Sequence, residues 1–318
     1  MPDRAPVVTL AAVKRAFGRT VAVDGITLQV GRGEMFGLIG PDGAGKTTTL
    51  RLICGLLRPD SGRVEVLGAD PFRDHRVATT SIGYLSQRFS LYGDLSIDEN
   101  IEFFARIHGV HDFAARRTRL LAMTGLEKFR TRLAERLSGG MKQKLALACT
   151  LVHEPPILVL DEPTTGVDPV SRREFWKLLA EFLSAGLTIL LATPYLDEAE
   201  RCGRVVLLSG GHVMADDEPA RLQAAMTGVI LEIVATPARR ALAVVRDRVG
   251  PERAQLFGDR LHVRVDTLAD ADPLVAALAQ AGVPASSVRP VTPTLEDVFI
   301  ERVTKTRAPE SHLGGLPS

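Results

Sequence analysis

Residues 40–47, Gly-Pro-Asp-Gly-Ala-Gly-Lys-Thr, decide the fold of this chain. They match the pattern G-x-x-x-x-G-K-[ST], a glycine-rich turn between a strand and a helix that cradles phosphate groups. An apolar strand is predicted just before it at residues 35–39, and a helical pattern follows at residues 47–57. Glycines let backbone N–H groups converge on phosphate oxygens, and the helix N-terminus favours negative charge. The stretch therefore predicts a P-loop NTPase fold of the α/β class.

The loop also supplies the predicted ligands for ATP and Mg²⁺. We expect Lys46 to neutralise the β- and γ-phosphates and the Thr47 hydroxyl to hold Mg²⁺. A glycine-rich turn without a ligand is the alternative, and the full eight-residue match between the right flanks disfavours it. The predicted nucleotide-binding residues are Gly40, Pro41, Asp42, Gly43, Ala44, Gly45, Lys46, Thr47 and Thr48.

A second apolar strand, at residues 157–160, ends in the adjacent carboxylates Asp161 and Glu162. Two carboxylates at one strand end can serve one phosphate as a metal ligand and as a base that activates water. We predict Asp161 as a Mg²⁺ ligand and Glu162 as the general base. Alone, such a strand end is often purely structural, but the phosphate loop in the same chain favours the catalytic interpretation.

Composition excludes several classes of protein. The formal net charge of +1, from 39 Lys plus Arg against 38 Asp plus Glu, argues against a nucleic-acid partner. The longest charge-free apolar stretch near the middle, residues 187–196, is far shorter than the ~20 residues of a membrane-spanning helix. The cysteines Cys54, Cys149 and Cys202 are widely spaced in apolar surroundings, which predicts reduced, buried thiols in the cytosol.

A length of 318 residues predicts two domains. Residues 1–226 form the first, with a helical subdomain at about 88–155 and a mixed sheet that includes an antiparallel β portion. Residues 227–303 predict a small α+β domain in the order β-α-β-β-α-β, a ferredoxin-like arrangement. A polar tail at 304–318 is expected to be disordered. The closely spaced strands that suggest the antiparallel portion are 7–13, 21–30 and 35–39.

The segment Leu-Ser-Gly-Gly-Met-Lys-Gln at 137–143 has two glycines at the start of a predicted helix. Each glycine costs about 1 kcal/mol relative to alanine in a helix, so a close approach by another group is expected there. Ser138 can cap this helix and leave N–H groups and a hydroxyl facing an anion. A flexible turn between helices is the alternative interpretation.

These three segments together resemble the ABC transporter ATPase family over about residues 7–226. The resemblance implies that Ser138, Gly139 and Gly140 act in trans on ATP held by another subunit of a homodimer or heterodimer. It also implies that Gln87 contacts Mg²⁺ or water. By the same resemblance Phe17 stacks on adenine, or is a core aromatic.

Two further segments carry expectations from the same resemblance. Asp168 resembles an aspartate at the dimer seam, or is simply the N-cap before Pro169. Residues 91–100, with a predicted capping box from Ser96 and Glu99, resemble the surface that receives a membrane permease, or form a well-capped surface helix.

Pro194 departs from the family pattern, because most members have a histidine there that contacts the γ-phosphate. Proline has neither a side-chain donor nor a backbone N–H, so we expect slow hydrolysis; Tyr195 is a weak candidate to compensate. A lost transition-state donor can be worth ~3 kcal/mol.

Residues 295–301 resemble the C-terminal helix of type-2 exporters. The resemblance implies an ATPase on the cytoplasmic face of the membrane that drives export of drugs or other hydrophobic compounds through a separate permease. The alternatives are a soluble ABC ATPase of translation or DNA maintenance, and a subunit that binds ATP with little hydrolysis.

Overall fold

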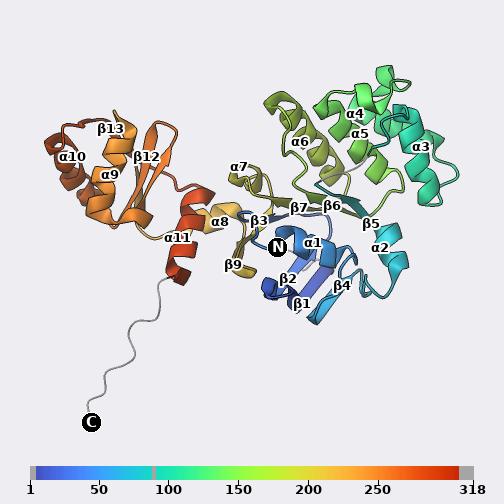
Figure 1. Cartoon of the computed structure of the whole chain (residues 1–318), viewed down its shortest axis with the longest axis horizontal. Coiled ribbons are helices and arrows are strands. Elements are labelled where there is room, and N and C mark those ends of the chain that lie inside the picture. Colours follow the sequence, from blue (N-terminus) through green and yellow to red (C-terminus); the bar gives the residue numbers. More distant parts are fainter. Residues whose placement is uncertain (1–4, 88–90, 308–318) are drawn as a thin grey trace, which may run out of the picture. The chain divides into compact units, whose positions relative to one another are not determined.

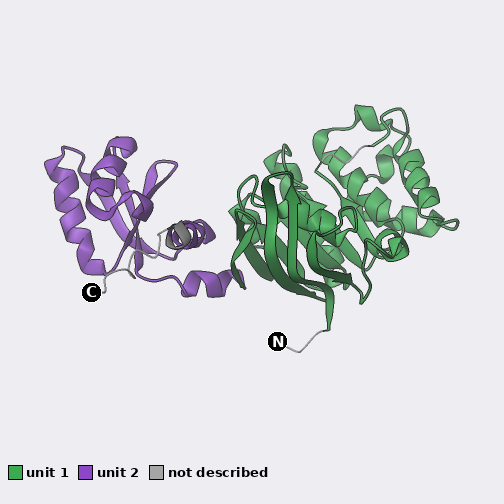
Figure 2. Ribbon diagram, turned by 60° about the horizontal axis from the view of Figure 1, so that its bottom comes forward, with its two compact units in different colours: residues 1–216 green, residues 217–318 purple. Residues whose placement is uncertain are grey.

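The computed structural model describes residues 5–87 and 91–307, and the chain divides into two compact units, 1–216 and 217–318 (Figure 2). The division falls earlier than the predicted boundary at residue 226. Helix α8 (Pro219–Ala224) accounts for the difference, since it contacts the C-terminal helix α11 (Leu295–Arg307) inside the second unit.

The first unit is built on a central sheet of six strands among the described residues, in the order β5-β6-β7-β3-β8-β9. Neighbours from β5 to β8 run parallel, and β3, β6 and β7 are buried along their whole lengths. Because carboxyl ends of parallel strands meet at one edge, the segments after β3, β6 and β7 are brought together. The strands are β3 (Met35–Ile39), β5 (Ile82–Leu85), β6 (Ile157–Asp161), β7 (Thr188–Thr193), β8 (Arg204–Ser209) and β9 (His212–Asp217).

A separate antiparallel sheet in the first unit has the order β2-β1-β4, with β1 at Pro6–Phe17, β2 at Thr20–Gly31 and β4 at Ser61–Val66. The predicted antiparallel portion is therefore present. The prediction was wrong to group Met35–Ile39 with it, because that strand pairs in parallel with β7 and β8.

Helices pack around the sheets, and α3 to α5, drawn in teal to green, correspond to the predicted helical subdomain (Figure 1). Residues 88–90 of that prediction lie outside the described residues. The predicted capping box of α3 is confirmed: Ser96 Oγ accepts from the Glu99 backbone and Glu99 Oε2 from the Ser96 backbone. The helices are α1 (Lys46–Ile53), α2 (His75–Ser81), α3 (Ile97–Ile107), α4 (Ala114–Thr124), α5 (Gly139–Leu151), α6 (Pro169–Ser184) and α7 (Leu196–Ala199).

Helix α1 ends at Ile53, four residues before the predicted end at Leu57. Gly55 explains the early stop: it has φ +67°, and a Cβ there would lie 2.2 Å from the Pro71 carbonyl oxygen. Only glycine fits such a position, so the chain turns away from the helix axis.

The second unit has the predicted order β-α-β-β-α-β, with an antiparallel sheet ordered β11-β12-β10-β13. This is a ferredoxin-like arrangement. Helix α11 follows and continues to Arg307, so residues 304–307 are helical rather than part of a disordered tail; residues 308–318 lie outside the described part. The elements are β10 (Val229–Ala235), α9 (Ala238–Val249), β11 (Ala254–Phe257), β12 (Arg260–Val265), α10 (Ala271–Gln280) and β13 (Ala285–Val291).

Within the described ranges, each helix falls short of the length and apolar character that crossing a bilayer requires.

Candidate active site

A pocket of about 570 Å³ lies at the carboxyl ends of β3, β6 and β7. It brings together the phosphate loop, the segment after β6 and the loop after β7, as the parallel topology requires. Its lining residues are Thr20, Val21, Ala22, Asp42, Gly43, Ala44, Gly45, Lys46, Thr47, Thr48, Gln87, Glu162, Thr165, Pro194 and Tyr195.

The phosphate loop owes its shape to glycines that serve different purposes. A Cβ on Gly40 would lie 2.3 Å from the Leu208 carbonyl oxygen, and one on Gly45 would lie 2.3 Å from the Ala22 carbonyl oxygen. These two glycines let the loop pack against its neighbours. Gly43 instead has φ +79° and open space where a Cβ would point, so it leaves backbone accessible from the pocket.

Lys46 is only 4% exposed and lies folded over the loop. Its Nζ donates to the carbonyl oxygens of Gly40 and Pro41, at 2.8 and 3.0 Å, and lies 3.7 Å from Glu162 Oε1. The ammonium group is therefore held between the loop and the predicted base, facing a pocket that can receive an anion.

Asp161 links the phosphate loop to β5. Thr47 Oγ1 donates to Asp161 Oδ1 at 2.9 Å, and the Tyr84 hydroxyl donates to Asp161 Oδ2 at 3.2 Å. Burial, and then the nearby Asp161 charge, raise the pKa of Tyr84, so this phenol stays a protonated donor. A hydroxyl, a carboxylate and the Gln87 amide are hard oxygen ligands, and Mg²⁺ typically takes one or two protein ligands of this kind beside phosphate and water. The residues present fit Mg²⁺.

Glu162 sits in a backbone conformation that is unusual for a residue other than glycine, with φ +49°. Its N–H donates to the Ala192 carbonyl oxygen at 2.8 Å, which ties it to β7. Its Oε2 accepts from Gln87 Nε2 at 2.8 Å and from Thr165 Oγ1 at 3.4 Å. The strained turn points the carboxylate of Glu162 into the pocket, and two side chains orient it.

The loop after β7 places Pro194 and Tyr195 on the pocket wall. Pro194 brings no hydrogen-bond donor to that wall. The Tyr195 N–H is directed away from the pocket, because it donates to Thr193 Oγ1 at 3.0 Å.

Several predicted residues lie outside this pocket's lining. Phe17 is 47% exposed, with the Arg15 guanidinium 5.0 Å from its ring centroid, so it is not the core aromatic that was the alternative. Ser138 and Gly139 are exposed, and Ser138 caps α5 by accepting from the Met141 N–H.

Asp168 caps α6, as predicted by the alternative that it is the N-cap before Pro169. Its Oδ1 accepts from the backbone of Val170 and Ser171. Hydrogen bonds from Ser171, first from its hydroxyl and then from its backbone N–H, lower the pKa of Asp168.

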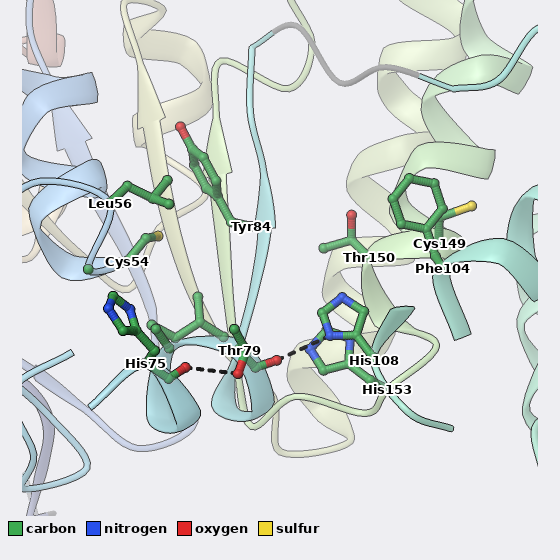
Figure 3. Close-up of a pocket in the computed structure, with 13 residues that line it drawn as sticks. Cys54, Leu56, His75, Thr79, Tyr84, Phe104, His108, Cys149, Thr150 and His153 are labelled. Carbon is green, nitrogen blue, oxygen red and sulfur yellow. Dashed lines mark hydrogen bonds between the residues drawn. The ribbon is translucent and has the colours of Figure 1, made fainter. Parts of the chain in front are cut away.

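A second pocket, of about 260 Å³, lies between the end of α1, α2, α3 and α5 (Figure 3). His108 and His153 stack in it with ring centroids 3.8 Å apart, and burial lowers the pKa of His153 to about 4. Burial raises the pKa of the Cys54 and Cys149 thiols that line it, so neither is a nucleophile. Among the residues described, no cluster of three or more His, Cys, Asp or Glu side chains could hold a metal.

Sequence reasoning missed residues that complete the first pocket. Thr20, Val21 and Ala22 reach it from the start of β2, and nothing in their local pattern indicates this. Thr165 could have been found, since it stands three residues after Glu162, within reach of that carboxylate.

Comparison with known proteins identifies the family to which the chain belongs. Residues 23–165 match the family described as "ABC transporter". The probable multidrug ABC transporter ATP-binding protein YbhF of Escherichia coli is 39% identical over 98% of this chain, which spans 54%, about half, of that relative. The daunorubicin resistance ATP-binding protein DrrA3 of Streptomyces coeruleorubidus is 36% identical, over 92% of this chain and 94% of the relative.

Among solved structures, the dimeric post-hydrolysis state of the ATP-binding cassette MJ0796, bound to ADP and Pi, aligns with a TM-score of 0.58. It is 27% identical and covers 66% of this chain and 98% of that cassette. The P-loop fold, the pocket and these similarities agree: the chain belongs to the ABC transporter ATP-binding family.

Proposed function

We propose that the chain binds Mg²⁺ and ATP in the pocket at the ends of β3, β6 and β7 and hydrolyses ATP there. The observation that carries this proposal is that one pocket is lined by Lys46, Thr47, Gln87 and Glu162. The Thr47 hydroxyl in turn donates a hydrogen bond to Asp161. A cation, hard oxygen ligands and a carboxylate base within one pocket are the parts that phosphoryl transfer to water requires.

Each of these residues has a distinct task in the proposed reaction. Lys46 and the backbone N–H groups of the loop bind the phosphates. Thr47, Asp161 and Gln87 hold Mg²⁺, which when bound neutralises charge on the phosphate oxygens. Glu162 takes a proton from water as that oxygen bonds to the γ-phosphorus and the bond to the ADP oxygen breaks, giving ADP and phosphate.

The signature residues Ser138 and Gly139 are exposed and do not line this chain's own pocket. This arrangement supports a composite site in which Ser138, Gly139 and Gly140 complete the nucleotide site of a second ATPase subunit, in a homodimer or a heterodimer. Phe17, with a half-exposed ring, is the proposed contact for adenine, and Asp168 lies at the proposed seam.

The proposed cargo class is drugs or other hydrophobic compounds, because the relatives include a probable multidrug ATP-binding protein and a daunorubicin resistance protein. The proposed partner is a separate integral membrane permease, contacted by the surface at residues 91–100. The chain would then work on the cytoplasmic face of the membrane. A role on nucleic acid is disfavoured by the net charge of +1.

A second candidate function is ATP binding with little hydrolysis, beside an active partner ATPase. The observation that favours it is Pro194 on the pocket wall, where it supplies no donor to the γ-phosphate. The ordered Glu162 carboxylate opposes it.

Lys46→Ala tests the proposed site. Titration of the full chain with a fluorescent ATP analogue and Mg²⁺ should saturate for the parent, and the variant should bind at least about tenfold more weakly. Lys177→Ala, on the exposed face of α6, is the matched control and should bind like the parent. No saturable binding by the parent, or equal binding by Lys46→Ala, overturns the proposal.

A further inference from the structure

A buried carboxylate outside the pocket lining joins two loops that form the pocket. Glu198, on α7 directly after β7, is 1% exposed. Its Oε1 accepts a hydrogen bond from the Thr164 hydroxyl, and its Oε2 accepts one of 2.8 Å from the Thr193 hydroxyl. Thr164 stands two residues after Glu162, and Thr193 stands directly before Pro194. One side chain thus connects the loop of the proposed base with the loop after β7.

Thr193 extends this connection to the pocket wall. Its hydroxyl donates to Glu198 and accepts from the Tyr195 N–H at 3.0 Å. Tyr195 lines the pocket. Through Thr193, the Glu198 carboxylate therefore fixes the Tyr195 backbone in the loop after β7 as well as the Thr193 side chain.

Arg172, on α6, supplies the charge that compensates the buried carboxylate. Its Nε lies 3.8 Å from Glu198 Oε1, and its guanidinium carbon lies 4.9 Å from the centroid of the Tyr195 ring. A buried carboxylate is costly unless it is hydrogen-bonded and paired, and here two hydroxyls and a guanidinium meet that requirement. Such a group holds its neighbours in one arrangement, because moving either loop leaves a buried charge without its partners.

We propose that Glu198 is a positioning residue of the ATPase site, which sets the loop after β7 at a fixed place relative to Glu162. This inference rests on the proposed hydrolysis. Glu198 acts through Thr164 and Thr193, since it does not line the pocket itself. Because a displacement of about 1 Å in a catalytic group can cost up to ~10²-fold in rate, loosening this connection should slow turnover more than it weakens binding.

Thr164→Val is the direct test, because it removes the bond between the loops and leaves the one between Glu198 and Thr193. With the full chain, Mg²⁺ and ATP, kcat should fall at least about fivefold while KM stays within about twofold of the parent. Thr164→Ser restores the hydroxyl and should restore most of kcat. Glu181→Gln, an exposed carboxylate on α6, is the control and should match the parent.

Hydrogen exchange gives a readout that does not depend on turnover. The peptide covering residues 190–200 should exchange faster in Thr164→Val than in the parent, and Thr164→Ser should reverse the change. If Thr164→Val does not fold, Glu198→Gln, which keeps the shape and one oxygen of the side chain, carries the same test of kcat and exchange.

The outcomes separate this inference from the proposed function. Unchanged kcat and unchanged exchange in Thr164→Val overturn the positioning role while the parent still hydrolyses ATP. A lower melting temperature with unchanged kcat also overturns it, because that result indicates a purely structural bond. A parent that binds ATP but releases no phosphate overturns the proposed hydrolysis, and the positioning role falls with it.

Discussion

Gln87 Nε2 donates a hydrogen bond of 2.8 Å to Glu162 Oε2, so the segments after β5 and β6 meet at one carboxylate. We expect Gln87→Ala to release this carboxylate and lower kcat for ATP by roughly tenfold, with nucleotide affinity changed by less than about threefold. Steady-state phosphate release and nucleotide titration measure the two quantities. Thr165→Val, which removes only the longer bond of 3.4 Å, should have a smaller effect. An equal loss in both variants would contradict a specific role for Gln87.

Pro194→His should raise the rate of hydrolysis, because it supplies a donor on the pocket wall where proline has none. A single transition-state donor is worth about 3 kcal/mol, so the increase could reach roughly 10²-fold if the imidazole meets the γ-phosphate. Single-turnover phosphate release measures it. Pro194→Ala is the control for loss of the proline ring alone. A rate for Pro194→His no faster than the parent's would show that proline does not limit hydrolysis.

Gly140 and Gly139 form a matched pair at the start of α5. A Cβ on Gly140 would lie 2.1 Å from Ser171 Oγ and 2.5 Å from Ser171 Cβ, whereas one on Gly139 would meet open space. Gly140→Ala should therefore lower the melting temperature, by overpacking that typically costs 1–3 kcal/mol. Gly139→Ala should keep or slightly raise it, since alanine favours the helix by about 1 kcal/mol. Differential scanning fluorimetry tests both.

Ser171→Gly should rescue Gly140→Ala, because it removes both atoms that the new methyl group would strike. If Gly139→Ala lowers ATP turnover without loss of stability, the result supports a contact of Gly139 with a partner's nucleotide. Equal melting temperatures for the two alanine variants would contradict the packing argument.

Glu232 makes the stability of the second unit depend on pH. Its carboxylate pairs with Arg289 at 2.8 Å and Arg260 at 3.0 Å, and these contacts, first with Arg289, hold the pKa of Glu232 below its usual value. A carboxyl whose pKa is lower in the folded state stabilises that state above its unfolded pKa, and the contribution is lost as pH falls.

Glu232→Gln should therefore lower the melting temperature of the second unit at pH 7. The difference from the parent should shrink as the pH falls below about 4.3, the usual pKa of a glutamate, and through the lower pKa that Glu232 has in the folded state. Thermal unfolding followed by circular dichroism between pH 3 and pH 7 measures this. Asp259→Asn, at an 88% exposed side chain, is the control. A difference that does not change with pH would contradict the linkage.

Local pattern was enough to predict the elements whose sequence carries its own signal. The order β-α-β-β-α-β of the second unit was predicted correctly, since its apolar runs and helical periods each have clear limits. The phosphate loop and the carboxylates after β6 were predicted because their chemistry needs a contiguous motif.

Relationships between distant segments could not be predicted in this way. The end of α1 depends on Pro71 lying against Gly55, and the sheet to which Met35–Ile39 belongs depends on strands more than a hundred residues later. Glu198 is a charged residue, yet it is buried because Thr164, Thr193 and Arg172 converge on it from the loop after β6, from β7 and from α6. Such partners are set by tertiary packing.

The contact between Gly140 and Ser171 has a mechanical consequence. Helix α5 begins directly after its cap Ser138 and helix α6 directly after its cap Asp168, and near these starts the two helices meet with no room for even a methyl group. Because the two helices are packed this closely, a tilt of α5 toward α6 must displace the start of α6 as well. Arg172 directly follows Ser171 on α6 and stacks on Tyr195. A movement of α5 would therefore also displace Arg172, and with it the part of the pocket wall that Tyr195 forms.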